Sequence, residues 1–307
     1  MNYNNRNYNN SETKKLVRGL MGTKYGPIIL VLLIIMSAAI GYYYYINGGS
    51  SISADANVEY HFIDIGQGDA SLILTDEAAV LVDCGTLEQS DIVLDYVSRY
   101  TDRIDLFVFS HAHDDHMGGA ANVIRNIPVD EVLMTSYASD AVFFEKALDA
   151  IEEYDVRVTE ALPGGTYTEG DVKIDVFAPV TDYEDHNSNS IIMRVEVDGS
   201  SVMYTGDAEH RTEKDALEKY SYDMKSDILK VGHHGSSTST CEAFFDAVSP
   251  KYGVISCGEG NSYGHPHRET KAFFAERELE YYRTDLVGDV VFVVKNGEIS
   301  VATGNKR

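Results

Sequence analysis

Five of the six residues from His111 to His116 are histidines or aspartates, and imidazole and carboxylate are groups that bind zinc, iron and manganese. Residues 105–109, directly before this motif, form a short apolar run that predicts a buried parallel strand, and residues 120–127 after it predict a helix. α/β folds commonly place their chemistry at the carboxyl ends of such strands. The motif therefore predicts a metal site rather than a solvated polar turn.

The spacing inside the motif predicts two metal positions. His111 and His113 are two residues apart on an extended segment, so both side chains point to one side and hold one ion. Asp115 and His116, at the turn into the helix, then face a second position. Gly118, which follows, lets the backbone pass close to the site without a Cβ in the way. We expect two divalent metal ions as cofactors, zinc or manganese by preference.

The motif His-x-His-x-Asp-His after a strand is typical of the metallo-β-lactamase fold, and five other motifs narrow the resemblance. They lie in chain order at residues 62–70 (FIDIGQGDA), 81–85 (LVDCG), 204–208 (YTGDA), 229–236 (LKVGHHGS) and 261–266 (NSYGHP). Together they resemble the extracytoplasmic hydrolase domain of DNA-uptake channel proteins of the ComEC/Rec2 type, over residues 58–302. The resemblance implies an α/β fold, a four-layer αββα sandwich, and a hydrolase with a dinuclear metal centre.

The hydrophobic pattern agrees with that architecture. Three β-rich segments (58–65, 70–75 and 78–82) come first, and alternating strands and helices follow. Two hairpin turns are predicted, one at Asp198-Gly199 and the other at Asn296-Gly297. This order predicts two sheets packed face to face with helices outside, in one domain at residues 58–307.

Two further segments supply candidate ligands at strand ends. Asp207 follows the predicted strand 201–205, at the same rim as His111, and the resemblance implies that it bridges the two ions; the alternative is a helix cap. His233 and His234 follow the strand 228–231, and because successive side chains at a strand end point apart, only one should bind metal. The resemblance favours His234 as the ligand and His233 as a substrate contact, although the reverse order stays open.

The third ligand of the first metal is ambiguous. The fold usually supplies a histidine before the next strand, which would be His186, whereas the channel-type relatives show an Asn-x-x-Ser pattern at this place. His186 is therefore either a ligand or an ordinary loop histidine, with equal weight. Asp83 is expected to hydrogen-bond a metal-binding imidazole. Asp64 and Asp69, which flank a Gly-Gln-Gly turn, are expected to stabilise that turn.

Catalytic roles follow from the chemistry of two ions that activate a shared water. Asp115 is expected to orient this water or accept its proton, and His233 or His265 to stabilise negative charge or protonate the leaving group. The complete prediction has three catalytic residues, Asp115, His233 and His265, and seven metal ligands: His111, His113, Asp115, His116, His186, Asp207 and His234.

The N-terminal region predicts a membrane anchor. Residues 26–46 carry no charge and match the thickness of a bilayer, while basic residues precede them, so residues 1–25 are expected in the cytoplasm as a disordered basic tail. Residues 47–57 are predicted to link the anchor to the domain. A cleaved signal peptide is the alternative. The predicted localisation is the cell membrane, single-pass, with the catalytic domain outside the cytoplasm.

The net charge of the protein limits the classes of substrate to be expected. The net charge is −24, and residues 1–50 contribute +4, so the remainder carries −28, the difference between the two. Such a surface repels long polyanions, so a small molecule or phosphodiester is favoured over a long nucleic acid. The predicted function is a phosphodiesterase or nuclease-like hydrolase, with an esterase, lactonase or phosphocholine esterase acting on envelope substrates as one alternative. Another alternative is a non-catalytic binding module with a decayed metal site. The three cysteines predict no disulfide framework.

Overall fold

The structure is a computed structural model that describes residues 56–220, 224–304 and 306. Within these residues, no helix combines the length and hydrophobicity needed to cross a bilayer. The predicted tail, anchor and most of the predicted linker lie outside the described residues, so the anchor at 26–46 stays a prediction.

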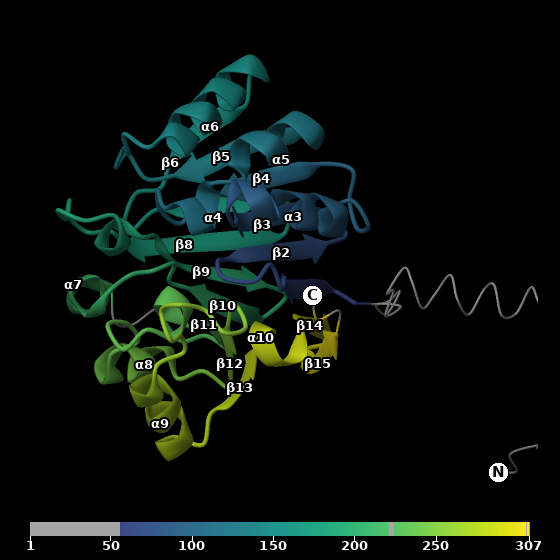
Figure 1. Cartoon of the computed structure of the whole chain (residues 1–307). Coiled ribbons are helices and arrows are strands. Elements are labelled where there is room, and N and C mark those ends of the chain that lie inside the picture. The colour runs from purple at the N-terminus through teal and green to yellow at the C-terminus, as the bar shows by residue number, and fades with distance from the viewer. Residues whose placement is uncertain (1–55, 221–223, 305, 307) are drawn as a thin grey trace, which may run out of the picture. The chain divides into compact units, whose positions relative to one another are not determined.

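Two sheets form the centre of the described region (Figure 1). The first has eight strands in the order β15-β14-β1-β2-β3-β4-β5-β6, and the second has seven in the order β13-β12-β11-β10-β9-β8-β7. The strands of the first sheet are β1 (Val58–Phe62), β2 (Ala70–Thr75), β3 (Ala79–Cys84), β4 (Ile104–Val108), β5 (Val129–Met134), β6 (Arg157–Glu160), β14 (Asp289–Lys295) and β15 (Glu298–Gly304). Those of the second are β7 (Thr166–Glu169), β8 (Val172–Ala178), β9 (Ile192–Val197), β10 (Ser200–Tyr204), β11 (Ile228–Lys230), β12 (Tyr252–Ile255) and β13 (Glu280–Arg283).

Alternation along the strands explains how the sheets stack. In β2 and β3, Ile73 and Val80 point into a core shared with the second sheet, while Leu72 and Leu81 point into a core shared with helices. A residue buried on each face gives the near-continuous apolar runs that are typical of strands covered on both sides. In the second sheet, Met203 of β10 likewise faces a third core that includes helix side chains.

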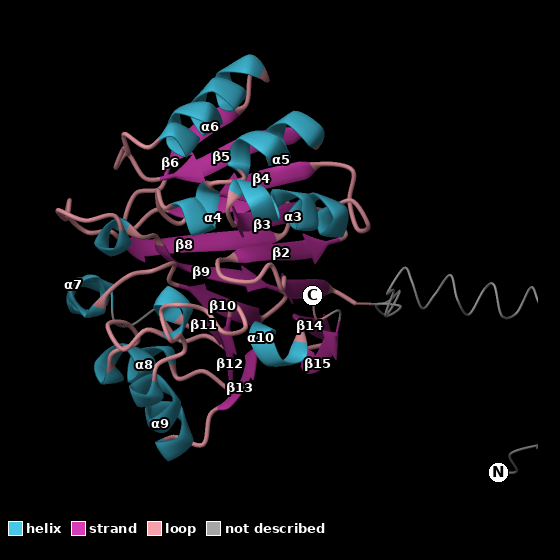
Figure 2. Ribbon diagram, in the orientation of Figure 1, coloured by secondary structure: helices cyan, strands magenta, loops and turns pink. Residues whose placement is uncertain are grey.

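The helices cover the two outer faces, as Figure 2 shows. Their bounds are α3 (Ser90–Val97), α4 (Asp114–Met117), α5 (Ala120–Asn126), α6 (Val142–Glu153), α7 (His210–Tyr220), α8 (Glu242–Val248), α9 (Arg268–Glu276) and α10 (Thr284–Val287), with short 3-10 turns η1 (Leu87–Gln89), η2 (Asn187–Asn189) and η3 (Gly232–Gly235). Helices α3, α5 and α6 pack on the first sheet, and α7, α8 and α9 on the second. The predicted four-layer αββα sandwich is confirmed for the described residues.

Most predicted elements are present, including both hairpins, whose turn residues Asp198-Gly199 and Asn296-Gly297 adopt positive φ as type I′ turns require. The prediction missed the edge strands β6, β7 and β13. Strand β6 is mostly exposed, so its residues carry no hydrophobic alternation from which a strand could be read.

The sheet topology decides where the site lies. Strands β3 and β4 of the first sheet run parallel, as do β10, β11 and β12 of the second. The segments after β4, β10 and β11 carry six of the candidate ligands, and they line one cavity together with the loop after β12, which carries His265. The ligands are therefore held by strand ends of both sheets.

Candidate metal centre

Six predicted ligands come together as two groups whose candidate ligand atoms lie within 4.8 Å of one another. Cluster 1 consists of His111, His113 and Asp207, and cluster 2 consists of Asp115, His116 and His234. The first two members of each cluster come from the loop after β4 and from α4, while the third comes from the loop after β10 or β11. The division of the motif into two metal positions thus has a geometric counterpart.

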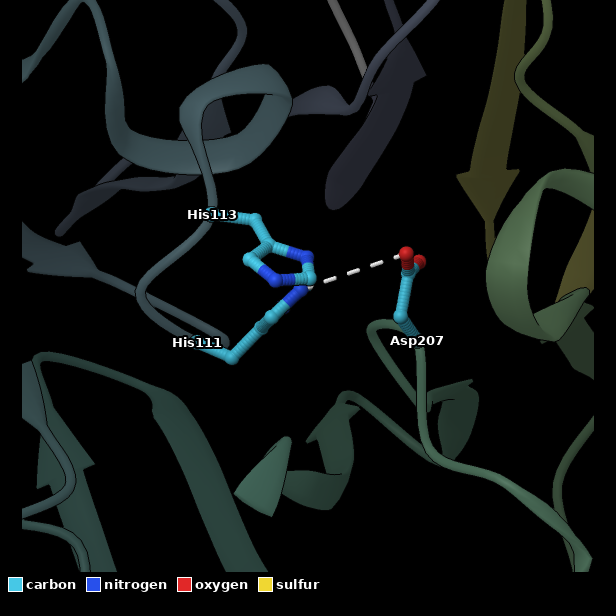
Figure 3. Close-up of side chains that lie close together, drawn as sticks. All are labelled: His111, His113 and Asp207. Carbon is cyan, nitrogen blue, oxygen red and sulfur yellow. Dashed lines mark ion pairs between the residues drawn. The ribbon is translucent and has the colours of Figure 1, made fainter. Parts of the chain in front are cut away.

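Asp207 lies between the clusters. Its Oδ2 is 3.9 Å from Nε2 of His111, and its Oδ1 is 3.2 Å from Nε2 of His116. Figure 3 shows the two cluster 1 imidazoles and the Asp207 carboxylate, which faces them from a loop; this loop follows β10 in the chain. Each oxygen is therefore directed to a different cluster, which is the arrangement a bridging carboxylate needs.

Buried acceptors orient the two imidazoles of cluster 2. Nδ1 of His116 lies 2.9 Å from Oδ2 of Asp83, so the expected contact between Asp83 and an imidazole of the motif is present. Nδ1 of His234 donates to the carbonyl of Ser256 at 3.0 Å, because a carbonyl only accepts. In both rings Nδ1 is occupied, and Nε2 is left to bind a metal.

Asp69 does more than stabilise the turn, the role predicted for it, because it also contacts Lys230 and His234. Its Oδ1 lies 3.2 Å from Nδ1 of His234, and its Oδ2 lies 2.7 Å from Nζ of Lys230. Burial alone would raise the pKa of Asp69, but Lys230 and His234 lower it well below the usual range. Lys230 is 1% exposed, so a buried ammonium–carboxylate pair stands directly behind a candidate ligand. The sequence analysis did not identify Lys230. The available signal was a lysine within an otherwise apolar predicted strand, residues 228–231.

The donor atoms themselves test whether metal ions fit. Nε2 of His111, His116 and His234 and Oδ1 of Asp207 are all buried without a hydrogen-bond partner within the described residues. Buried polar atoms are normally paired, because leaving one unpaired costs free energy. Unpaired imidazole nitrogens beside a carboxylate are what divalent ions would satisfy, so the residues present fit the cofactor.

The two clusters differ in their protonation. Burial lowers the pKa of His111 well below its usual value and also lowers that of His113. Burial acts in the same direction on His116 and His234, but Asp207 and further carboxylates outweigh it, raising the pKa of His116 well above its usual value and that of His234 to about 10. Without metal, cluster 2 thus holds protons that an ion would displace.

The adjacent histidines after β11 do not point apart as we expected, although among the described residues His234 and not His233 belongs to a cluster of candidate ligand atoms. Nε2 of His233 lies 3.6 Å from Oδ2 of Asp207, and Nε2 of His234 lies 3.6 Å from Oδ1. Both residues are in left-handed backbone conformations, with φ of 51° and 53°. The alternation of an extended strand does not apply there, because the chain has already turned.

His186 belongs to neither cluster of candidate ligand atoms. Its ring lies 5.2 Å from that of His113, and its Nδ1 is buried with no hydrogen-bond partner in the part of the chain that the structure describes. The next residue, Asn187, lines the cavity at the metal centre, and its Oδ1 is also buried and unpaired. Asn187 is the first residue of the Asn-x-x-Ser pattern, a signal that was present in the sequence.

The cavity has a volume of about 230 Å³ and is lined by Gln67, His113, Asp115, Asn187, Asp207, His233, His234, Tyr263 and His265. Burial and the neighbouring His234 and His233 lower the pKa of His265 to about 4, so its ring is neutral at pH 7. A neutral imidazole suits a hydrogen bond to substrate better than proton donation. Tyr263 is 65% exposed and stacks on His265.

Comparison with known proteins agrees with this geometry. Residues 63–259 match the family model described as Metallo-beta-lactamase superfamily. The chain belongs to this superfamily. It is also similar to ComE operon protein 3 of Bacillus subtilis (strain 168), with 28% identity across 78% of this chain and 33% of that protein. Competence protein ComA of Neisseria gonorrhoeae is 30% identical across 77% of this chain and 32% of that protein.

The resemblance inferred from the motifs is thereby confirmed. The chain spans about a third of the length of these curated relatives. Among solved structures, the metallo-beta-lactamase fold protein YhfI from Bacillus subtilis covers 80% of this chain and all of its own, with a TM-score of 0.53 and 14% identity, which supports the fold. Family and ligand clusters together support a metal-dependent hydrolase.

Proposed function

We propose that this chain is a dinuclear metal-dependent phosphodiesterase. The observation that carries the proposal is the convergence of two ligand clusters on Asp207, with buried donor atoms that lack partners in the described residues. When bound, two divalent ions supply Lewis acidity that activates water and stabilises negative charge on a phosphoryl group. Cluster 1 would hold one ion and cluster 2 the other, with Asp207 shared.

Charge at the site favours an anionic substrate. The buried residues Asp69, Asp83, Asp207 and Lys230, together with the half-buried Asp115, carry a net charge of −3 when all are ionised. Two divalent ions would bring this group to +1, which attracts a phosphodiester more than a neutral ester. The acidic remainder of the domain disfavours long nucleic acids, so we propose a small phosphodiester or the end of a short oligonucleotide as substrate.

The chain's own residues have distinct roles. Oδ2 of Asp115 lies 3.2 Å from Nε2 of His234, and although burial opposes it, His234 and His116 lower the pKa of Asp115 to about 2. An ionised Asp115 would bind metal and orient water, and would be a weak base. His233 and neutral His265 line the cavity and would donate hydrogen bonds to the phosphoryl oxygens or the leaving group.

An activity screen tests the proposal. Full-length protein loaded with Mn²⁺ or Zn²⁺ is offered bis-p-nitrophenyl phosphate, single-stranded DNA and a p-nitrophenyl ester, and metal content is measured in parallel. We expect about two ions per chain and hydrolysis of the phosphodiester in preference to the ester. Ester hydrolysis alone would favour the esterase alternative, and metal binding without any turnover would favour the binding module.

We further propose that residues 26–46 anchor the protein with the domain outside the cytoplasm, on the basis of the charge asymmetry around that segment. A reporter enzyme that is active only after export, fused behind Arg307, should be active in cells. Activity of a cytoplasm-only reporter at the same position would contradict this orientation.

A further inference from the structure

Gln67 lies in the loop between β1 and β2 and lines the cavity at the metal centre. Its Oε1 accepts a hydrogen bond from the backbone N–H of Gly258 at 3.1 Å. Because only the oxygen of the amide accepts, this contact fixes which way the amide faces. The other end, Nε2, is buried and has no hydrogen-bond partner within the described part of the chain.

The loop that carries Gln67 is held tightly. Its carbonyl accepts from Nε2 of Gln89 at 2.8 Å, and the backbone N–H of Asp69 donates to the carbonyl of Asp115 at 3.0 Å. A Cβ on Gly258 would come within 2.8 Å of the backbone nitrogen of Gln67, and one on Gly68 within 2.6 Å of the backbone oxygen of Asp115. Close backbone packing on two sides therefore places the Gln67 amide rigidly.

A rigid, buried donor without an acceptor is destabilising unless something supplies the acceptor. Gln67 shares its cavity with Asp207 and His233, so an acceptor bound between them and Gln67 would come from the substrate. A donor that is already in position needs no reorganisation when negative charge develops, which is how preorganised amides stabilise transition states.

We propose that Nε2 of Gln67 donates a hydrogen bond to a non-esterified oxygen of the substrate's phosphoryl group. This inference rests on the proposed phosphodiesterase function. As the oxygen of water bonds to phosphorus and the ester P–O bond breaks, the water loses one proton, the phosphoryl oxygens gain charge in the transition state, and the leaving oxygen takes up one proton. Gln67 neither gives up nor gains a proton; it stabilises the charge and orients the group.

Two variants separate the donor from a merely structural role. Gln67→Glu keeps an oxygen for Gly258 but removes the donor, whereas Gln67→Met removes both at similar size. Gln89→Met keeps the Gln67 donor but removes a bond that holds its loop, because Nε2 of Gln89 donates to the Gln67 carbonyl and Oε1 accepts from the Thr86 N–H. Full-length protein is loaded with Mn²⁺, and metal content, thermal stability and kinetics on bis-p-nitrophenyl phosphate are compared.

Binding of inorganic phosphate, measured by calorimetry, adds a readout that needs no turnover. We expect both Gln67 variants to retain their metal, to bind phosphate at least about tenfold more weakly, and to lose about 10²-fold in kcat, the usual effect of removing one such donor. Because Gln89→Met keeps the Gln67 donor, its phosphate affinity should fall less than that of either Gln67 variant.

Each other pattern has a definite meaning. If only Gln67→Met weakens phosphate binding, the contact with Gly258 is what matters, and the proposal is overturned. If only Gln67→Glu does, charge repulsion explains the result, and the proposal is again overturned. If the wild-type protein binds phosphate with the help of Gln67 but cleaves no phosphodiester, the assigned function fails while the donor role stands.

Discussion

Cluster 1 and cluster 2 use the same kinds of side chain, but the protein supports them differently. In cluster 2, His116 is backed by Asp83 at 2.9 Å, and His234 by the Ser256 carbonyl at 3.0 Å. In cluster 1, His111 has only the hydroxyl of Ser110 at 3.2 Å, and the side chain of His113 makes no hydrogen bond among the described residues.

The difference in support predicts a difference in affinity. Hydrogen bonds to the far nitrogen fix the ring orientation and raise the basicity of a metal-binding imidazole. We therefore expect cluster 2 to retain its ion at neutral pH and cluster 1 to exchange its ion more readily. Among the described candidate ligands, Asp207 directs one carboxylate oxygen to each cluster, so we expect both ions to depend on it.

The largest effect should come from Asp207. Asp207→Ala removes the shared carboxylate and leaves two cations to repel each other, so phosphodiester hydrolysis should fall by at least about 10³-fold. Asp207→Asn keeps the size of the side chain but not its charge, and its rate of phosphodiester hydrolysis should fall almost as far. Steady-state kinetics with metal analysis measures both, and wild-type rates in Asp207→Ala would refute the shared-ligand mechanism.

Asp83 tests the support of cluster 2. Asp83→Asn is the suitable variant, because Asp83 has a φ of 57° and Asn tolerates the left-handed region. Loss of the carboxylate behind His116 should lower the affinity for one of the two ions by about 10–100-fold, as measured in a titration against a competing chelator. Ser110→Ala is the milder change, because it removes the hydroxyl beside Nδ1 of both His111 and His116 but keeps the Asp83 carboxylate, so it should weaken metal binding less. Equal weakening by both variants would show that the Asp83 carboxylate is not the support of cluster 2.

How much of this centre could be predicted depends on whether the partners are close in sequence. The motif from His111 to His116 carries four of the predicted ligands within six residues, so their spacing alone predicted both metal positions. The contact of Asp69 with Lys230 joins the two sheets across 161 positions, the difference of their numbers, and no local pattern encodes it. The fold followed from the same logic, since buried strands were predicted and exposed edge strands such as β6 were not.

The backbone at His233-His234 was also unpredictable, because histidine seldom adopts positive φ and nothing in the composition signals it. The ambiguity at His186 arose for another reason. Two neighbouring residues both carry ligand-type atoms, and only the cavity lining distinguishes Asn187 from His186.

The next prediction is that the metal affinities of the two clusters depend differently on pH. In the absence of metal, carboxylates raise the pKa of His234 to about 10 despite its burial, while burial lowers the pKa of His111. Below pH 10, an ion entering cluster 2 must displace a proton from each of His234 and His116, so its affinity should fall about tenfold per pH unit for each of these protons as the pH drops from 8 to 6. Cluster 1 should change less. Metal titrations at these pH values measure the two steps, and parallel slopes would contradict the assignment.

The smallest of these effects distinguishes Asn187 from His186 at cluster 1. Oδ1 of Asn187 is unpaired in the cavity, so Asn187→Ala should weaken the more exchangeable ion by about tenfold, at the low end for lost metal-site contacts. His186→Ala is the matched control and should leave both affinities nearly unchanged. The opposite order in a chelator titration would make His186 the ligand.

The left-handed backbone at His233-His234 implies that the geometry of the site lowers the stability of the fold. A residue with a Cβ in this conformation costs about 1–2 kcal/mol, which glycine avoids. His233→Gly should therefore raise the free energy of unfolding of the metal-free protein by up to about 1 kcal/mol while lowering turnover. Ser249, left-handed at φ of 47° at the end of α8, is a matched position outside the metal cavity. Ser249→Gly should give a similar gain without loss of activity, so selection for stability alone would remove the histidine and keep the sandwich.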